Sequence, residues 1–230
     1  MNRALILSLV FLFLVGMGHS HLSAQKAVGK TTSVPMVLSG FDTIRLQKPD
    51  TLSGVPLLQA AQQRRTARDF KSMNLSTKHL SEVLWMAYGV NRPNGKRTVP
   101  SARALYPLRV YAVLSNGIYY YNPAKHILEP VAQGDYRGLC GVQDFVATAP
   151  LNLIFVSDIF KYGDPQKVPE TTRIKISAID AGHCTQNVYL YCASEKLSCV
   201  ERAMVSEDEL LKVLQLDDKF RFIIAQTVGY

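Results

Sequence analysis

Several segments of the chain carry apolar residues at the three- and four-residue spacing of an amphipathic helix. The first begins after Pro56, and the second lies between a Ser76 cap and Gly89. Ser206 and Glu209 have the spacing of a capping box and open the last one. The apolar positions are Leu57, Leu58, Ala60 and Ala61 in the first segment, Leu80, Val83, Leu84 and Ala87 in the second, Ile176, Ile179, Cys184, Val188 and Tyr191 in the third, and Leu210, Leu211, Val213 and Leu214 in the last.

Other segments have the composition of strands. Residues 109–114 and 117–121 are rich in β-branched and aromatic residues and are separated by a short turn, which predicts a hairpin. The uninterrupted apolar run at 151–156 predicts a buried central strand, and residues 222–228 predict a closing strand. A short strand is also expected at 36–38. Because helices and strands are interspersed without a regular βαβ rhythm, the sequence predicts an α+β fold.

The chain divides into a signal, an arm and one domain. Residues 1–24 have the layout of a secretory signal, with a basic start, an apolar run and a polar stretch that ends at Ala24. The run is shorter than the ~20 residues that cross a bilayer. We expect cleavage of a Sec-type signal near Ala24, a periplasmic or secreted product and no stable membrane insertion, with an uncleaved anchor as the alternative. Residues 25–54 suit an extended arm, and residues 55–230 suit a single domain.

Composition narrows the class of protein. Hydrophobic residues make up 47% of the chain and charged residues 19%, which suits a globular domain with a sizeable core. The formal net charge of +8 favours an anionic ligand. Nucleic acid is not the expected partner, because the sequence has no nucleic-acid-binding motif and its lysines and arginines are dispersed apart from one cluster.

The four cysteines do not have the paired spacing of a zinc site, so the sequence predicts no metal. Cys184 and Cys192 would lie about 12 Å apart on one helix, at about 1.5 Å per residue, which is too far for a disulfide. Buried free thiols are the simplest interpretation. A disulfide of Cys140 or Cys199 stays open for an exported chain.

The basic cluster is the densest group of candidate binding residues. Arg64, Arg65, Thr66 and Arg68 place guanidinium groups and a hydroxyl close together at a predicted helix end. Arginine binds phosphate through two parallel hydrogen bonds, and a threonine hydroxyl adds another donor. The cluster is therefore either a phosphate-binding segment or a solvated basic turn.

Further motifs favour the first interpretation. The run Arg-Arg-Thr-Ala-Arg-Asp-Phe at 64–70 is followed by Leu-Trp-Met-Ala-Tyr-Gly-Val-Asn-Arg at 84–92 and by Pro-Ser-Ala-Arg-Ala-Leu-Tyr-Pro at 100–107. In this order the motifs resemble the nitroreductase superfamily, and most closely its SagB-type, or thiazoline-oxidase-like, dehydrogenases. The resemblance covers residues from about 57 to 230.

This resemblance implies a nitroreductase-like α+β fold with a mostly antiparallel sheet flanked by helices, an obligate type of homodimer, and FMN as cofactor. The basic cluster would hold the flavin phosphate and ribityl chain. The proline-bounded loop, which comes from the partner subunit in most relatives, would lie along the isoalloxazine. By position, the FMN-binding residues are Arg64, Arg65, Thr66 and Arg68 in the cluster, and Pro100, Ser101, Ala102, Arg103 and Leu105 in the loop.

The implied activity is a ping-pong transfer of an electron pair through the flavin, to or from a small organic substrate such as a nitro compound or a quinone. The redox chemistry belongs to the cofactor, so no protein nucleophile is required. Arg103 is a candidate for stabilising the reduced flavin. The alternatives are oxidation of azolines in a modified peptide, and a flavin-binding or ligand-binding module without turnover.

The third predicted helix resembles the family's core helix, and its mostly apolar face predicts that it packs inside the domain. His183 on that face is either catalytic or, as the favoured interpretation, a hydrogen-bonded core residue. Gly182 suggests a close helix approach. The chain departs from the family's pattern twice: residues 196–198 are Lys-Leu-Ser in place of the usual Gly-Leu-Gly, and the chain ends at Tyr230, where many relatives continue with a basic residue.

Overall fold

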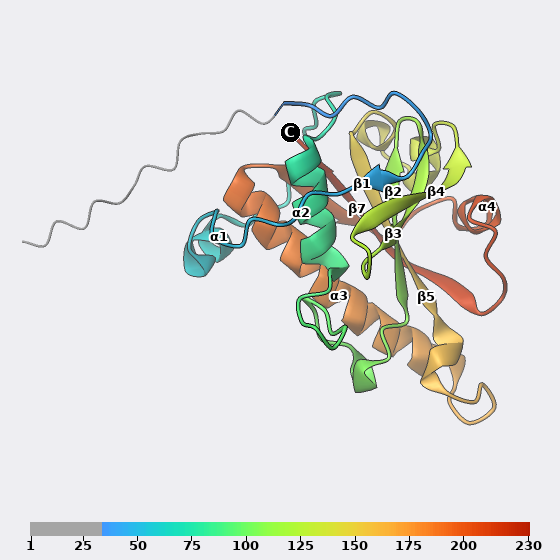
Figure 1. The fold of residues 1–230 in the computed structure, drawn as a ribbon. Coiled ribbons are helices and arrows are strands. Elements are labelled where there is room, and N and C mark those ends of the chain that lie inside the picture. Colours follow the sequence, from blue (N-terminus) through green and yellow to red (C-terminus); the bar gives the residue numbers. More distant parts are fainter. Residues whose placement is uncertain (1–33) are drawn as a thin grey trace, which may run out of the picture. The chain divides into compact units, whose positions relative to one another are not determined.

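The computed structural model describes residues 34–230, and the expected export signal at residues 1–24 lies outside the described residues. Within residues 34–230 the central element is a seven-stranded sheet in which every neighbouring pair of strands is antiparallel (Figure 1). Along the sheet the strand order is β1, β4, β3, β2, β5, β7, β6. The strands are β1 (Ile44–Arg45), β2 (Leu108–Leu114), β3 (Gly117–Asn122), β4 (Ile127–Gln133), β5 (Leu151–Asp158), β6 (Ser198–Arg202) and β7 (Phe220–Gly229).

The main predicted strands are present, with small shifts at their ends. β2 and β3 form the expected hairpin, with Leu114 opposite Gly117 beside its turn. The apolar run predicted as a central strand is β5, which pairs with β2 on one side and with β7 on the other. Residues of β5 are buried on both faces of the sheet, which explains why the run is almost entirely apolar. The α+β class with an antiparallel sheet is confirmed.

The helices also begin close to the predicted positions. They are α1 (Leu57–Gln63), α2 (Thr77–Tyr88), α3 (Glu170–Glu195) and α4 (Glu207–Val213), with short 3-10 turns η1 (Ala102–Ala104), η2 (Arg137–Cys140), η3 (Asp144–Ala147) and η4 (Ile159–Tyr162). Ser76 caps α2 as predicted, since its hydroxyl oxygen accepts from the His79 amide at 3.1 Å. α4 begins directly after Ser206, but the Ser206 side chain makes no capping hydrogen bond, so the predicted capping box is not formed.

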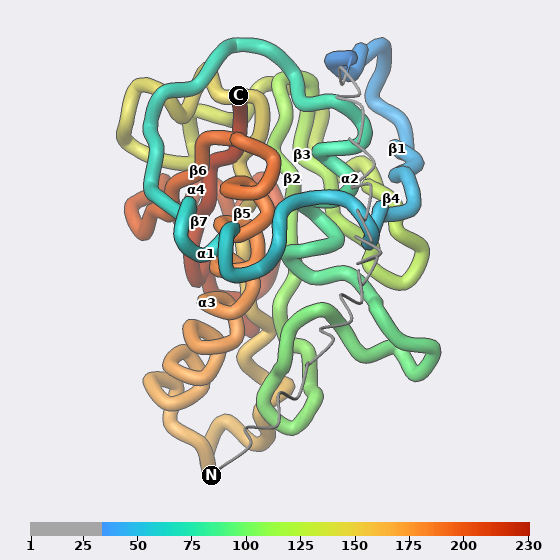
Figure 2. Tube along the Cα trace, turned by 90° about the vertical axis from the view of Figure 1, so that its left-hand side faces the viewer, coloured from blue at the N-terminus to red at the C-terminus, as the bar shows by residue number. Residues whose placement is uncertain are grey.

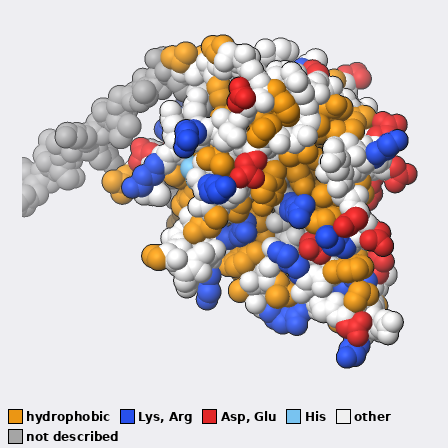
Figure 3. All heavy atoms as spheres, turned by 45° about the vertical axis from the view of Figure 1, so that its right-hand side comes forward, with side chains coloured by type: hydrophobic (Ala, Val, Ile, Leu, Met, Phe, Trp, Pro, Cys, Tyr) orange, Lys and Arg blue, Asp and Glu red, His pale blue; other side chains and the backbone are white. Residues whose placement is uncertain are grey.

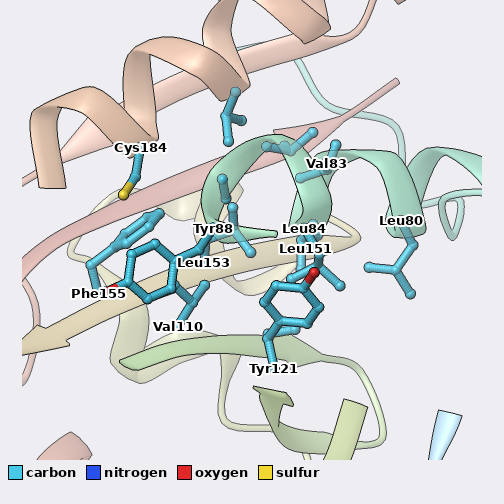
Figure 4. Packing of buried hydrophobic residues seen from close by; sticks show 14 of the residues in the cluster. Leu80, Val83, Leu84, Tyr88, Val110, Tyr121, Leu151, Leu153, Phe155 and Cys184 are labelled. Carbon is cyan, nitrogen blue, oxygen red and sulfur yellow. The ribbon is translucent and has the colours of Figure 1, made fainter. Parts of the chain in front are cut away.

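The sheet separates two hydrophobic cores. Residues of β2 alternate between them: Val110 and Ala112 face the core that α2 and α3 cover, and Tyr111 and Val113 face the core that α4 covers. Figure 4 shows the first core, in which side chains of α2 pack against the sheet and Cys184 comes from α3. α3 is thus fixed against the sheet along one of its faces. All four cysteines are buried free thiols.

The described part of the arm packs along the sheet and α2. The strand expected at residues 36–38 is not formed. Met36 instead donates its amide to the Leu75 carbonyl beside an isolated bridge between Pro35 and Ser76, and the pairing goes no further because α2 begins at Thr77. The strand of this region is β1, which pairs with β4. Farther along, the Gln47 amide donates to Ser81 Oγ at 2.9 Å, so the arm is anchored on α2 as well.

Candidate functional site

The basic cluster directly follows α1, and Arg64 is the C-terminal cap of that helix. The Ala67 amide donates to the Cys199 carbonyl of β6 at 3.0 Å, and the Lys71 amide donates to the Tyr230 carbonyl at 2.8 Å. The segment that carries the cluster therefore runs along the free edge of β6 and over the end of β7. Figure 2 shows this segment as the teal tube between α1 and α2.

The side chains of the cluster differ in exposure. Arg65, Thr66 and Arg68 are exposed, whereas Arg64 is half-buried, with its guanidinium carbon 5.4 Å from the centre of the Tyr189 ring. Thr66 Oγ1 lies 3.4 Å from the Tyr189 hydroxyl. Within residues 34–230, no carboxylate forms an ion pair with any arginine of the cluster. Their positive charge is thus available to an anion.

Tyr189 connects the cluster to α3 and β6. Its hydroxyl contacts Thr66 and accepts from the Glu201 amide at 2.9 Å. Burial raises the pKa of Tyr189, so the phenol stays protonated at neutral pH and keeps a proton to donate. Tyr189 carries no functional signal in the sequence, because an aromatic residue on the buried side of a helix has the same pattern as any core residue.

The proline-bounded loop at residues 100–107 contains η1 and has an unusual backbone. Arg103, Ala104 and Tyr106 have φ angles of 53°, 56° and 47°. None of them is glycine, and the left-handed conformation costs such a residue about 1–2 kcal/mol. Strain of this kind persists only where the surrounding structure enforces it, and it clusters at functional sites.

Hydrogen bonds to α3 and η4 hold this loop in place. Ser101 Oγ donates to Asp180 Oδ2 of α3 at 2.6 Å, and the Ala102 amide donates to Asp180 Oδ1 at 3.3 Å. The Ser101 hydroxyl oxygen also accepts from the Tyr106 amide at 3.0 Å. From η4, Lys161 Nζ donates to the Tyr106 carbonyl at 3.2 Å. The loop is therefore fixed beside the N-terminal half of α3.

The other predicted residues of the loop lie on its outer side. Pro100 and Arg103 are exposed, and Leu105 is half-buried. Arg103 Nη2 donates to the Tyr162 carbonyl at 2.8 Å. This bond fixes the direction of the guanidinium group while leaving it open to solvent, so Arg103 presents a positive charge at the surface of the loop.

α3 has a buried face and an exposed face. Cys184 and Val188 lie on the buried face, and the helix packs on the sheet along it, as predicted. On the other face Ile179 is 53% exposed, and His183 is exposed too. The interpretation of His183 as a hydrogen-bonded core residue is therefore wrong, because an apolar helix pattern does not show which neighbour covers each side. No close approach occurs at Gly182 either, since a Cβ added there meets no described atom within 4 Å.

The basic cluster and the loop meet α3 at different heights (Figure 2). The cluster contacts α3 at Tyr189, and the loop contacts it at Asp180. These two residues are about 14 Å apart along the helix axis, at about 1.5 Å per residue. Between these levels the exposed face of α3 carries His183 and Gln186. In one copy of the chain, the two candidate segments therefore flank the same helix at a distance that an extended ligand could span.

The structure shows the backbone and the contacts at the two places where the sequence departs from the expected family pattern, Lys196 and Tyr230. Lys196 ends α3 in the left-handed conformation, with φ of 59° and ψ of 36°. Glycine adopts this conformation without strain, whereas lysine does not. At the chain end, the Tyr230 hydroxyl accepts from the Ser76 amide at 3.1 Å and lies 3.0 Å from His79 Nδ1. The last residue is therefore tied to the start of α2.

Basic residues do not form a continuous surface on the face shown in Figure 3, where Lys and Arg side chains lie among hydrophobic and acidic ones. A polyanion such as nucleic acid is bound through many phosphate contacts along an extended basic surface. The distribution on this face suits a small anion at a local site better.

Sequence comparisons identify related proteins. A sequence model of the nitroreductase family matches residues 61–230. A protein of Methanocaldococcus jannaschii with a provisional nitroreductase name is 30% identical over 187 residues, which are 77% of this chain and 92% of that protein.

Solved structures agree with this relationship. A provisionally assigned nitroreductase of Ralstonia eutropha JMP134 is 39% identical, with a TM-score of 0.75 and coverage of 85% of this chain and 92% of that chain. A chain of an Escherichia coli microcin synthetase complex with truncated pro-MccB17 bound is 21% identical, with a TM-score of 0.58 and coverage of 81% and 77%. This second likeness shows a shared fold.

The antiparallel sheet flanked by helices and the similarity to these relatives together identify the chain as an oxidoreductase of nitroreductase-like fold. The chain belongs to the nitroreductase family. Among residues 34–230, no helix combines the length and the apolar character needed to cross a bilayer.

Proposed function

We propose that the protein is an FMN-dependent oxidoreductase that transfers electron pairs between small molecules by a ping-pong mechanism. The observation that carries the proposal is that the basic cluster, whose arginines have no carboxylate partner in the described residues, and the strained loop both contact one helix, α3. In a dimer that packs through this helix, a phosphate at the cluster of one copy and a flat ring at the loop of the other would use both segments. Bound FMN would supply the redox chemistry, since its ring accepts and releases an electron pair.

The donor groups of the chain suit FMN. Arg65 and Arg68 offer exposed guanidinium groups without a carboxylate partner in the described residues, and Thr66 offers a hydroxyl. Phosphate oxygens accept strong, charge-assisted hydrogen bonds from such groups. In the loop, Ala102 and Ala104 carry only methyl groups, so the backbone can approach a flat ring closely. The proposed FMN-binding residues are Arg64, Arg65, Thr66, Arg68, Pro100, Ser101, Ala102, Arg103 and Leu105.

Arg103 and His183 are the proposed reactive-site side chains. The Tyr162 carbonyl anchors one side of the exposed Arg103 guanidinium. Its charge would stabilise negative charge that builds up beside it during reduction. His183, on the exposed face of α3, would meet either the substrate or the partner subunit. No nucleophile from the protein is required.

Exposed apolar side chains favour a homodimer. Leu57 and Leu58 of α1 are 68% and 83% exposed, and Ile179 of α3 is 53% exposed. α1 and α3 pack against each other, so these residues lie on one pair of helices. A second copy of the chain would cover such apolar surface. It would also bring its own loop toward the first copy's cluster, so that each site uses parts of both copies.

We further propose that the protein is exported, with residues 1–24 as a cleaved signal. Mass spectrometry of the protein from the cell envelope or medium should then find a mature chain that begins near Gln25. Because reduced nicotinamides are cytoplasmic, an exported enzyme would take its electrons from another small donor, such as a quinol or a thiol. A full-length chain that stays in the cytoplasm would contradict export while leaving the redox function untouched.

The test of the redox function is the absorption spectrum of the purified mature protein, followed by anaerobic titration with NADH or a quinol. The proposal expects a flavin spectrum that the donor bleaches and a nitro compound or a quinone restores, with parallel lines in double-reciprocal plots. Intersecting lines would contradict the ping-pong mechanism. A flavin that no donor reduces would indicate a binding module, and one reduced only by an azoline-containing peptide would indicate the activity of the SagB-type branch. A colourless protein that takes up no added FMN would overturn the proposal.

A further inference from the structure

Asp180 is a buried carboxylate whose side-chain partners belong to the proposed flavin loop. Asp180 is 3% exposed and follows the exposed Ile179 on α3. Its Oδ2 accepts from Ser101 Oγ at 2.6 Å, and its Oδ1 accepts from the Ala102 amide at 3.3 Å. Among residues 34–230, no cation forms an ion pair with it. A buried charge requires such hydrogen bonds, so the loop is the group that compensates the burial of Asp180.

The loop depends on the same contacts. The positive φ angles within residues 100–107 make its backbone unfavourable in isolation, so neighbouring groups must fix its shape. Asp180 fixes the start of the loop through Ala102. It fixes the end through Ser101, whose hydroxyl oxygen accepts from the Tyr106 amide at 3.0 Å while its proton goes to the carboxylate. One carboxylate therefore closes the loop on itself.

The Tyr106 ring also packs beside Tyr88, and two further side-chain anchors of the loop are open to solvent. Lys161 and Arg103 are both exposed, and each donates to a single backbone carbonyl. Exposed charged groups exchange their partners with water at little cost, so such contacts hold a loop weakly. The bond between Ser101 and Asp180 is short, its carboxylate is buried, and it connects the start and the end of the loop.

We infer that Asp180 is a positioning residue of the flavin site, whose carboxylate holds residues 100–107 in the shape that lies along the ring. This inference rests on the proposed function. Asp180 does not touch the cofactor and acts through Ser101 and Ala102. Because Ile179 and Asp180 are consecutive, one turn of α3 anchors the loop on its buried side and carries the apolar surface proposed for the second copy on its exposed side.

The first measurement uses the flavin-free protein and follows hydrogen exchange of peptides that cover residues 100–107. Asp180→Asn keeps the shape of the side chain but removes one acceptor, and Ser101→Ala removes the bridging hydroxyl. In both variants the amides of Ala102 and Tyr106 should exchange faster by on the order of tenfold, because each variant loses a charge-assisted hydrogen bond of the anchor. If Asp180→Asn does not fold, Ser101→Ala carries the test.

Glu170→Gln is the matched control, because Glu170 lies on the same helix but pairs with Arg221 at 2.7 Å instead of the loop. Exchange of the loop should be unchanged in this variant. In the double variant with Ser101→Ala and Asp180→Asn, the increase in exchange should be smaller than the product of the two single increases, since the two changes share the hydrogen bond between Ser101 and Asp180.

The second measurement uses FMN-loaded protein, with whichever of NADH or a quinol bleaches the wild-type flavin as donor and a nitro compound as acceptor. Asp180→Asn should weaken FMN binding by less than about tenfold, because the basic cluster is intact and only the loop is loosened, while kcat/KM at saturating FMN falls by on the order of tenfold. Unchanged kinetics in a variant that binds FMN would overturn the positioning role, whether or not exchange of the loop is faster, and would leave the proposed function standing. A wild-type protein that binds no FMN would refute both.

Discussion

Replacing Lys196 with glycine should stabilise the protein. Lys196 ends α3 with a φ of 59° and is exposed, so its side chain contributes little packing. A non-glycine residue in the left-handed conformation costs about 1–2 kcal/mol. The greater freedom of glycine in the unfolded chain offsets about 0.5–1 kcal/mol of the relief. The net expectation is an increase of about 0.5–1 kcal/mol in the free energy of unfolding.

Thermal unfolding followed by circular dichroism can resolve this change. For chains of roughly 150–250 residues, about 1 kcal/mol corresponds to a shift in Tm of about 2–4 °C, so Lys196→Gly should raise Tm by about 1–4 °C. Lys175→Gly is the matched control, since Lys175 is an exposed lysine in the body of the same helix. Glycine there should lower stability by about 1 kcal/mol. A Lys196→Gly variant that melts at or below the wild-type Tm would refute the reasoning.

Three further changes test the site, the dimer and an acid-sensitive contact. Arg68→Ala should weaken FMN binding about 10- to 100-fold in a fluorescence titration, since a hydrogen bond to a charged group contributes about 1.5–3 kcal/mol. Ile179→Glu should give a monomer in light scattering, because a carboxylate is costly to bury against a second copy. The hydrogen bond with His79 holds the pKa of Glu195 below its usual 4.5. Its contribution to stability is therefore present above about pH 4.5 and lost in stronger acid, and Glu195→Gln should remove this part of the pH dependence of Tm.

Each of these changes has a control or a contradicting result. Arg92→Ala removes an exposed arginine that donates to the Asn91 side chain and to the Arg97 carbonyl, outside the basic cluster, and it should leave FMN affinity unchanged. Val142→Glu alters a valine that is 63% exposed outside α1 and α3, and it should leave the dimer intact. The first prediction would be contradicted by wild-type FMN affinity in Arg68→Ala, and the second by an Ile179→Glu protein that is still a dimer. The third would be contradicted if the Tm of Glu195→Gln depended on acid pH as strongly as that of the wild type.

The elements with strong periodic signals could be predicted from the sequence. The hairpin of β2 and β3 and the central strand β5 were recognisable because burial of their faces requires apolar residues at fixed spacing. The cap at Ser76 was recognisable from local chemistry. Ser206 has the same local chemistry, but its side chain forms no cap, since local preference does not decide how the chain enters α4.

Features that depend on contacts between distant residues could not be predicted. Ser101 and Asp180 are 79 positions apart, and nothing local to either one indicates that they meet. The left-handed backbone at Ala104 is equally hidden, because alanine carries no signal for it. For His183, the apolar helix pattern suggested burial, but that pattern fits a surface for a second copy as well as it fits a core.

The central claim is that one FMN site combines the basic cluster of one copy with the loop of its partner. Co-expression of two defective variants tests it most directly: in one, Arg64, Arg65 and Arg68 are replaced by alanine, and in the other, Ala102→Trp fills the place of the ring. Each variant alone should be colourless. A mixed dimer keeps one site with both parts intact, so its flavin absorbance should return to about half of the wild-type value. A mixed dimer as colourless as its parents would contradict the claim.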